Sequence, residues 1–311
     1  MAERDALMTK FRDALLDIVV SKDKDLPTVL AHYTTTDGLL SIMKKSELWF
    51  SDARFLSDTT ELNYGIHLME EVFESRQEQL RDSGILASMS FHGHPLKGYL
   101  TDTFSNAIAP YIFCLCENAN QLSQWRSYSN TRGYSICFLS RELLRLKPDL
   151  SGKSPDQTFL CKVVYEADKQ REIAEAVVGA IIQFAKRFKQ VPPLPGEAEL
   201  PLSFLVMAAK GMLDCVIQFK DSCFQEEQEW RVYCWIAKDD QNLLSYRNKA
   251  DLILPYLVMK NPNEKHLLPI SGIYFSSSSD EPIREKGLRM LCSSKGYENV
   301  SVIANGFPAL R

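Results

Sequence analysis

The fold of this chain is decided by three stretches: PYIFCLCE (110–117), GYSICFLS (133–140) and TFLCKVVYE (158–166). Each is short and rich in β-branched, aromatic and other apolar residues, which predicts strands. A polar insert, QLSQWRSYSNTR (121–132), separates the first two, and a short helical tract, RELLRL (141–146), follows the second. We expect a sheet to be built from these three strands.

Helices and further strands follow one another irregularly on both sides of these stretches. Apolar residues at helical spacing predict helices over 7–20, 35–47, 58–73, 85–108, 170–190, 202–219 and from Asp280 onward. Further β-rich runs are VLAHYT (29–34), LWFS (48–51), QEWRVYCWIA (228–237), DLILPYLVM (251–259), GIYFSS (272–277) and NVSVIA (299–304). Because helices are inserted between separated groups of strands, the pattern predicts an α+β fold rather than a regular doubly wound sheet.

The length of 311 residues allows one large domain or two ordinary ones. We predict a single domain over 1–311, in which 1–27 form an N-terminal helix and loop. Four prolines and a glycine interrupt helical periodicity in VPPLPGEAELP (191–201), so 190–202 are predicted to be a proline-rich loop within that domain.

Composition excludes several classes of protein. Charged residues make up 24% and the net charge is −4, so the chain lacks the broad positive field of a protein that grips long nucleic acid. No apolar run reaches the ~18 residues that would span a membrane. The eight cysteines lie mostly as singletons in apolar runs, without an export signal, which favours a cytoplasmic location. The spacing of Cys114 and Cys116 does not suit a zinc pair, so no metal is predicted.

A first candidate site lies in the predicted strand 29–34, which carries His32, Tyr33 and Thr34. Side chains alternate along a strand, so His32 and Thr34 share one face and Tyr33 lies on the other. The alternative interpretation of His32 is a core histidine.

A second candidate is the acidic start of the strand 228–237. On a strand, Glu227, Glu229 and Arg231 would share a face, which suits a polar site. The alternative is an edge strand protected by its charges.

A third candidate is the insert between the first two central strands, which contains Trp125, Arg126 and Tyr128. Aromatic rings beside a guanidinium can stack on a nicotinamide or a nucleobase, although Trp and Tyr are also common core residues. In a fourth stretch, 51–61, Asp58 and Glu61 favour a helix cap over a cation site.

Four segments together resemble the DUF2971 family, a bacterial group of cytoplasmic proteins, across most of the chain. They are LAHYTTTDGLLSIMKKSELWFSDARFLSDTTELNYG (30–65), FCLCENANQLSQWRSYSNTRGYSICF (113–138), EEQEWRVY (226–233) and FPALR (307–311). The HYT strand and the helix and strand after it are also similar to the opening of ADP-ribosyltransferase folds, in particular DNA-modifying toxins and RNA 2'-phosphotransferases. This resemblance implies an ADP-ribosyltransferase-like mixed sheet core with inserted helices.

The same resemblance implies roles for individual residues in binding and cleaving NAD. Glu229 would be the catalytic acid and Glu227 the first glutamate of an ExE pair, while His32 would bond a ribose hydroxyl, with Thr34 supporting it and Tyr33 beside it. Trp125 or Tyr128 would stack on nicotinamide. Arginine suits a pyrophosphate because its guanidinium is bidentate, and the candidates for this role are Arg54, Arg126 and Arg231.

The resemblance therefore implies an NAD-dependent ADP-ribosyltransferase that modifies a nucleic acid or a protein, in a bacterial toxin or a phage-defence effector. We expect no membrane partner, but we do expect a partner or inhibitor protein. Two alternatives remain open. One is an NAD glycohydrolase, and the other is a module that binds a nucleotide or a partner without catalysis.

Overall fold

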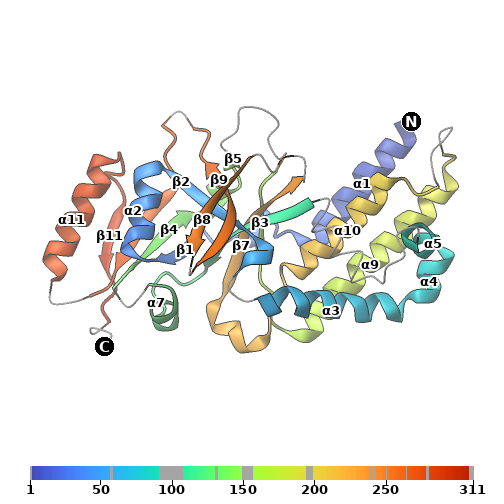
Figure 1. The fold of residues 1–311 in the computed structure, drawn as a ribbon, viewed down its shortest axis with the longest axis horizontal. Helices are drawn as coiled ribbons and strands as arrows, with labels where there is room; N and C mark the ends of the chain where they lie inside the picture. The colour runs from blue at the N-terminus through green and yellow to red at the C-terminus, as the bar shows by residue number, and fades with distance from the viewer. Residues whose placement is uncertain are drawn as a thin grey trace. The chain divides into compact units, whose positions relative to one another are not determined.

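A computed structural model describes residues 2–56, 59–90, 108–129, 132–148, 157–193, 199–237, 240, 243–249, 251–263, 265–277 and 280–307. The chain divides into two compact units (Figure 1). A helical unit comprises 1–21, 56–109 and 163–224, and a sheet unit comprises 22–55, 110–162 and 225–311. The prediction of a single domain over 1–311 stays a prediction.

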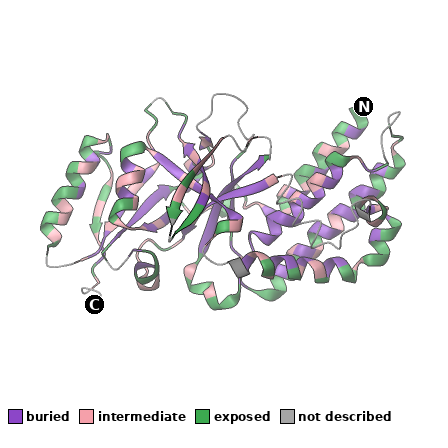
Figure 2. Ribbon diagram, in the orientation of Figure 1, coloured by how far each residue is buried: buried purple, intermediate pink, exposed green. Residues whose placement is uncertain are grey.

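The helical unit is a packed group of helices that come from three separate parts of the chain. They are α1 (Ala2–Val19), α3 (Thr59–Ser75), α4 (Gln77–Asp82), α5 (Ile85–Ser90), α9 (Ala167–Gln190) and α10 (Leu202–Val216). Helices α1, α9 and α10 pack against one another, and α3 packs against α9 and α10. Their inner faces are buried and their outer faces are exposed (Figure 2), as the apolar spacing of an amphipathic helix requires.

Aromatic side chains fill the core of the helical unit. Phe11 of α1 stacks on Phe204 of α10 with 4.6 Å between ring centroids, and Phe188 of α9 meets Phe204 at 5.1 Å. Gly211 allows α10 to approach α1, because a Cβ at that position would lie 2.9 Å from a methyl carbon of Leu15.

A buried polar network joins α3, α9 and the segment after α10. Lys220 Nζ lies 2.9 Å from Glu61 Oε1, and both side chains are nearly covered. The buried amide of Gln170 donates to the carbonyl oxygens of Val164 and Lys220 and accepts from the Tyr64 hydroxyl. Every polar group in this list meets a partner, so the network stabilises the unit without an unmet charge.

The sheet unit contains, among the described residues, an 11-stranded sheet. Its strands are β1 (Val29–Thr34), β2 (Glu47–Asp52), β3 (Ile108–Cys116), β4 (Tyr134–Leu139), β5 (Lys147–Pro148), β6 (Phe159–Lys162), β7 (Glu229–Ala237), β8 (Leu244–Lys249), β9 (Leu252–Lys260), β10 (Ile270–Phe275) and β11 (Ser301–Ala304). The order is β11-β10-β4-β1-β3-β2-β9-β5, with β7 beside β3 and β6, and β8 beside β9. β10 and β11 are parallel, and β1 pairs with β4 in antiparallel register.

In the described part of the sheet unit, four helices accompany the sheet: α2 (Thr36–Lys45), α7 (Leu122–Tyr128), α8 (Ser140–Leu143) and α11 (Glu281–Ser294). α2 packs against β1, β2 and β4, α7 against β1, and α11 against β11. Thr35 caps α2 by accepting a hydrogen bond from the Gly38 amide, and Ser46 ends it in the left-handed region at φ 52°.

The predicted mixed α+β fold with a mixed sheet is confirmed. The predicted N-terminal helix is α1, and the loop after it contains a 3-10 turn at Asp23–Asp25. The predicted proline-rich loop 190–202 lies between α9 and α10, with 194–198 outside the described residues. Residues 91–107 of the predicted helix 85–108, Asp58 and residues 308–311 of FPALR also lie outside them. None of the helices in the described ranges is long and apolar enough to cross a membrane.

Candidate functional site

His32 lies where β1 and β3 meet in the sheet unit. The two strands pair at Ala31 and Cys116, and next to this pair His32 Nδ1 lies 2.9 Å from the carbonyl oxygen of Cys114. A carbonyl oxygen only accepts hydrogen bonds, so Nδ1 carries the hydrogen and Nε2 of the neutral ring is an acceptor. The ring also packs on Phe113, with 4.3 Å between centroids.

The imidazole of His32 is neutral at neutral pH. Burial lowers its pKa to about 4, the hydrogen bond to Cys114 opposes this, and the positive charge of Arg247 lowers it further. His32 is therefore positioned as a hydrogen-bond acceptor through Nε2, not as a cation. Thr34, two residues on, lies against the first turn of α2, where a Cβ at Gly38 would be 2.0 Å from its Oγ1.

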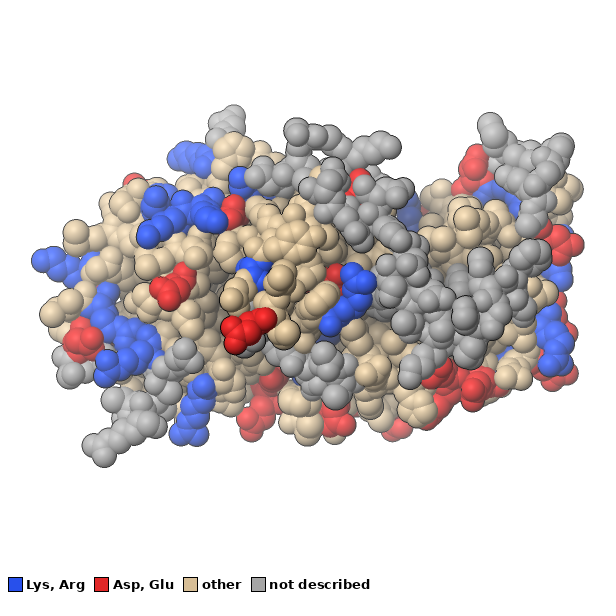
Figure 3. All heavy atoms as spheres, in the orientation of Figure 1, with Lys and Arg blue, Asp and Glu red and all other residues tan. Residues whose placement is uncertain are grey.

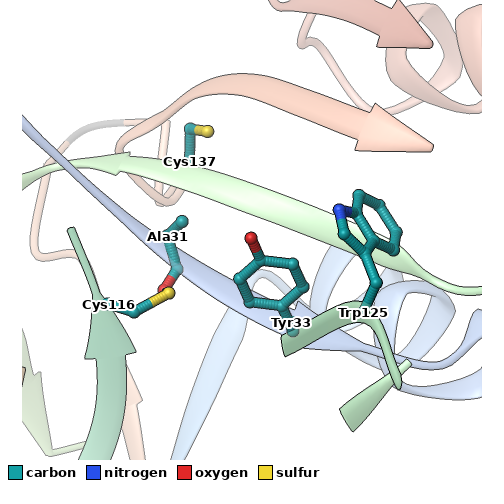
Figure 4. Packing of buried hydrophobic residues seen from close by; sticks show 5 residues of the cluster. All are labelled: Ala31, Tyr33, Cys116, Trp125 and Cys137. Carbon is teal, nitrogen blue, oxygen red and sulfur yellow. The ribbon is translucent and has the colours of Figure 1, made fainter. Parts of the chain in front are cut away.

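Tyr33 lies on the opposite face of β1, as strand alternation predicts, in a buried cluster with Ala31, Cys116, Trp125 and Cys137 (Figure 4). Its ring meets Trp125 edge-on at 5.3 Å. Its hydroxyl donates to the Asn118 carbonyl at 2.8 Å and accepts from the Gln121 amide at 2.7 Å. Burial raises the pKa of Tyr33 well above its usual range, so it stays protonated and anchors the loop before α7.

The two rings of α7 have different environments. Trp125 is 0% exposed and donates from Nε1 to Asn120 Oδ1 at 3.0 Å, as a core residue would. Tyr128 is 46% exposed, and its hydroxyl donates to Glu227 Oε1 at 3.0 Å. Arg126 is exposed beside it. Of the two aromatic candidates, Tyr128 is thus the one with a ring open to solvent.

Glu229 and Arg231 form a buried ion pair at the start of β7. Arg231 donates from Nε to Glu229 Oε1 at 2.7 Å and from Nη2 to Oε2 at 3.1 Å, and the two residues are 1% and 5% exposed. They share a face of the strand, as predicted. Trp230 between them donates to Glu117 Oε1 at 2.8 Å. The Glu229 carboxylate is therefore fixed in position by a bidentate partner.

One prediction about this segment was wrong. Glu227 does not lie on the strand with Glu229, because a 3-10 turn runs through Ser222–Glu227 and Gln228 adopts φ 45° before β7 begins at Glu229. The turn instead directs Glu227 to Tyr128. Both Glu229 and Glu227 still contribute, after burial and Cys137, to raising the pKa of the Cys116 thiol, so both lie within electrostatic reach of the Tyr33 cluster.

Arg54 follows β2 and forms an ion pair with the carboxylate of Asp52. Its Nε donates to Asp52 Oδ1 at 2.9 Å, its Nη2 meets Oδ2, and Asp52 is fully buried. Hydrogen bonds to Asp52 raise the pKa of Arg54, so the cation is held by this pair. Arg54 and Arg231, two of the three arginines predicted to meet a pyrophosphate, thus already bind carboxylates.

The contacts thus link some of the predicted residues to one another, while Glu229 with Arg231 and Arg54 with Asp52 form separate ion pairs. Tyr33, Trp125, Tyr128 and Glu227 are linked through the loop before α7 and the turn before β7. Gln121 joins the two segments, because its backbone N–H donates to the Tyr33 hydroxyl and its side-chain Nε2 donates to the Glu226 carbonyl. His32 has its own contacts with Cys114 and Phe113. The meeting of His32 and Glu229 in one site stays a prediction.

Sequence reasoning missed Arg247 on β8, which lies beside Trp49, Ser51 and Tyr256. The segment LSYRNK (244–249) has only two apolar residues, Leu244 and Tyr246, and no β-branched residue, so its local strand signal is weak. Within the described residues, no group of three or more His, Cys, Asp or Glu side chains is placed to hold a metal ion. Over the sheet unit, the face seen in Figure 3 carries basic side chains near α2 and α11, with acidic ones between them.

Comparison with known proteins gives one match. No curated protein and no solved structure shows a significant match to this chain. The resemblance to ADP-ribosyltransferases therefore stays a prediction, while the resemblance to DUF2971 is confirmed over part of the chain. Residues 124–232, which include Trp125, Tyr128, Glu227, Glu229 and Arg231, match the family DUF2971, described as a protein of unknown function.

Proposed function

We propose that this protein binds NAD on an ADP-ribosyltransferase-like sheet core and transfers ADP-ribose to a nucleic acid or a protein. The observation that carries this proposal is the group of side chains at the start of β7. The hydroxyl of the exposed Tyr128 donates to Glu227, and Arg231 holds the carboxylate of Glu229 in position. A ring that can stack beside fixed carboxylates is what cleavage of a nicotinamide glycoside requires.

The chemistry assigns a distinct role to each of these residues. Tyr128 stacks on the nicotinamide, and the bond between the nicotinamide nitrogen and the anomeric carbon breaks with its electron pair going to the leaving group. Positive charge then develops on the ribose, and the Glu229 carboxylate stabilises it. The acceptor attacks the anomeric carbon and gives its proton to Glu227, the less buried carboxylate, as general base.

His32 fits the part of a ribose ligand in this proposal. Because its pKa is about 4, the ring is neutral at the pH of a cell, and Nε2 can accept a hydrogen bond from a ribose hydroxyl. The hydrogen bond from Nδ1 to Cys114 holds the ring in the tautomer that this contact needs. The setting of a bacterial toxin or phage-defence effector is supported by resemblance alone.

One observation favours a second candidate, a nucleotide-binding module without catalysis. The Glu229 carboxylate is buried and already accepts two hydrogen bonds from Arg231. A carboxylate neutralised in this way stabilises a developing positive charge less than one without a bound cation. If the ion pair persists when NAD binds, the protein recognises the nucleotide without cleaving it.

The decisive experiment incubates the purified full chain with NAD labelled in the adenylate part, together with protein, DNA or RNA. Label on a macromolecule supports transfer, and Glu229→Gln should abolish it. Glu285→Gln is the matched control, because Glu285 lies in an exposed ion pair with Arg289 on α11. Glu227→Gln, at a less buried position, tests the general base without removing the partner of Arg231.

The remaining outcomes separate the alternatives. Release of free ADP-ribose without labelled acceptor indicates an NAD glycohydrolase. Binding of NAD with neither product indicates the non-catalytic module. Full transfer by Glu229→Gln would contradict the role of Glu229, and absence of NAD binding by the wild-type protein would contradict the proposal as a whole.

A further inference from the structure

Arg247 is held in an unusual position by three neighbouring strands. β9 pairs with both β2 and β8, so that Ser51 lies opposite Tyr256 and Arg247 lies opposite Leu254. The guanidinium lies over the rings of Trp49 and Tyr256, with its central carbon 5.7 Å and 5.8 Å from their centroids. Its Nη2 donates to Ser51 Oγ at 2.8 Å. Aromatic and hydroxyl contacts, not a carboxylate, thus fix this cation.

No carboxylate in the described part of the chain pairs with Arg247, in contrast to Arg54 and Arg231. Glu47, which shares a face of β2 with Trp49 and Ser51, accepts instead from Trp49 Nε1 at 2.8 Å and lies 3.6 Å from Lys45. The Nε atom of Arg247 is buried and has no hydrogen-bond partner within the described residues. A partly buried guanidinium remains charged, so an unmet N–H on it is a donor that lacks an acceptor.

The charge balance around this guanidinium points to an anionic ligand. Burial lowers the pKa of Arg247, and only a smaller contribution from Tyr256 opposes it. Burying a cation without a counter-charge lowers stability, and such groups in proteins are ordinarily paired. A bound anion would supply the missing acceptor and the missing charge together.

We propose that Arg247 and Ser51 form a binding site for a phosphate group, and that this phosphate belongs to the nucleotide of the proposed function. The Nε and Nη groups of an arginine match two oxygens of a phosphate. Ser51 accepts from Arg247, so its own hydroxyl hydrogen is available for a third oxygen. Trp49 and Tyr256 hold the guanidinium in place, which reduces the conformational entropy lost on binding.

The position of Arg247 relative to His32 supports a shared ligand. The charge of Arg247 is among the causes that lower the pKa of His32, so the two side chains lie within electrostatic reach. A nucleotide whose ribose bonds His32 would bring its phosphates into the same neighbourhood. The identity of the ligand as a nucleotide rests on the proposed function. The binding of a phosphate group by Arg247 and Ser51 does not depend on it.

The test measures binding of inorganic pyrophosphate, ADP-ribose, NAD and nicotinamide riboside to the full chain by calorimetry. Arg247→Gln should weaken the first three on the order of tenfold, as expected when a charged hydrogen-bond partner is lost, and leave nicotinamide riboside unchanged. Arg247→Lys keeps the charge but not the planar guanidinium, so its affinity for these ligands should lie between those of the wild type and Arg247→Gln. Arg289→Gln, which breaks an exposed ion pair, is the control.

The outcomes distinguish this site from the proposed enzyme. If Arg247→Gln binds pyrophosphate and NAD as the wild type does, Arg247 is only structural and the site is overturned, although NAD transfer can still hold. If pyrophosphate and ADP-ribose bind through Arg247 but NAD is never cleaved, the site stands and the transferase falls. No binding of any phosphate ligand overturns the site. Should Arg247→Gln fail to fold, Ser51→Ala provides the same comparison, and unchanged binding in it would count against the site.

Discussion

The arginine at the start of β7 and the arginine on β8 differ in how their charges are met. Arg231 is 1% exposed and meets the two oxygens of Glu229, so its charge is satisfied within the protein. Arg247 is held by two aromatic rings and a serine and pairs with no carboxylate among the described residues. A guanidinium bonded to a carboxylate contributes to the fold, whereas we propose that one without a counter-charge binds an anionic ligand.

The first test removes Arg231, the arginine that is paired with a carboxylate. Arg231→Gln should lower the free energy of unfolding by about 3–5 kcal/mol, because it leaves the buried carboxylate of Glu229 without its cation. Urea denaturation followed by circular dichroism measures this value. Arg289→Gln, in an exposed pair, should change it by no more than about 0.5 kcal/mol. A loss below about 1 kcal/mol for Arg231→Gln would show that the buried pair is not a structural one.

The second test uses pH. The pKa of His32 is about 4 in the folded chain and near 6.5 in the unfolded chain, so the unfolded chain binds more protons between these values. Stability should therefore fall as the pH drops from about 6.5 to about 4, by at most about 3.4 kcal/mol from this residue. Comparing the wild type with His32→Gln by thermal melts across this range isolates the contribution. Equal slopes in the two proteins would contradict a neutral His32 with a lowered pKa.

Alternation along β1 and β7 was predictable from the sequence because a strand has a period of two residues. It correctly separated His32 from Tyr33 and placed Glu229 beside Arg231. It wrongly placed Glu227 on the same strand face, because Gln228 adopts a left-handed backbone conformation. No residue type in EEQEW predicts this conformation. The sequence also left open whether Trp125 or Tyr128 is exposed, because both lie on one short helix whose orientation is decided by Tyr33.

Arg247 could not be found from the sequence for a different reason. Its contacts come from β2, about two hundred positions earlier, and from β9 on the far side of a hairpin, and the register of three strands brings them together. Nothing in LSYRNK itself distinguishes this arginine from an exposed one. Long-range register, not local pattern, therefore decides which arginine lacks a carboxylate.

A third test examines the loop that links Tyr33 to α7. Tyr33→Phe removes a hydroxyl that both donates to Asn118 and accepts from Gln121. The free energy of unfolding should fall by about 1–2 kcal/mol, since two partly buried backbone groups each lose a hydrogen bond. Tyr128→Phe, which loses one exposed hydrogen bond to Glu227, should cost less than about 0.5 kcal/mol and serves as the comparison. Equal losses would mean that the Tyr33 hydroxyl is not an anchor of this loop.

A fourth test replaces Arg247, the arginine without a carboxylate partner among the described residues. Because no carboxylate pairs with it among the described residues, Arg247→Gln should change the free energy of unfolding by less than about 1 kcal/mol, unlike Arg231→Gln. The same variant should raise the pKa of His32 above about 4, since one of the charges that lower it is gone, while burial, the larger cause, remains. Proton NMR of the five histidines, assigned with His32→Gln, follows this pKa directly. An unchanged pKa would place Arg247 outside the reach of His32 and separate the phosphate site from the ribose contact.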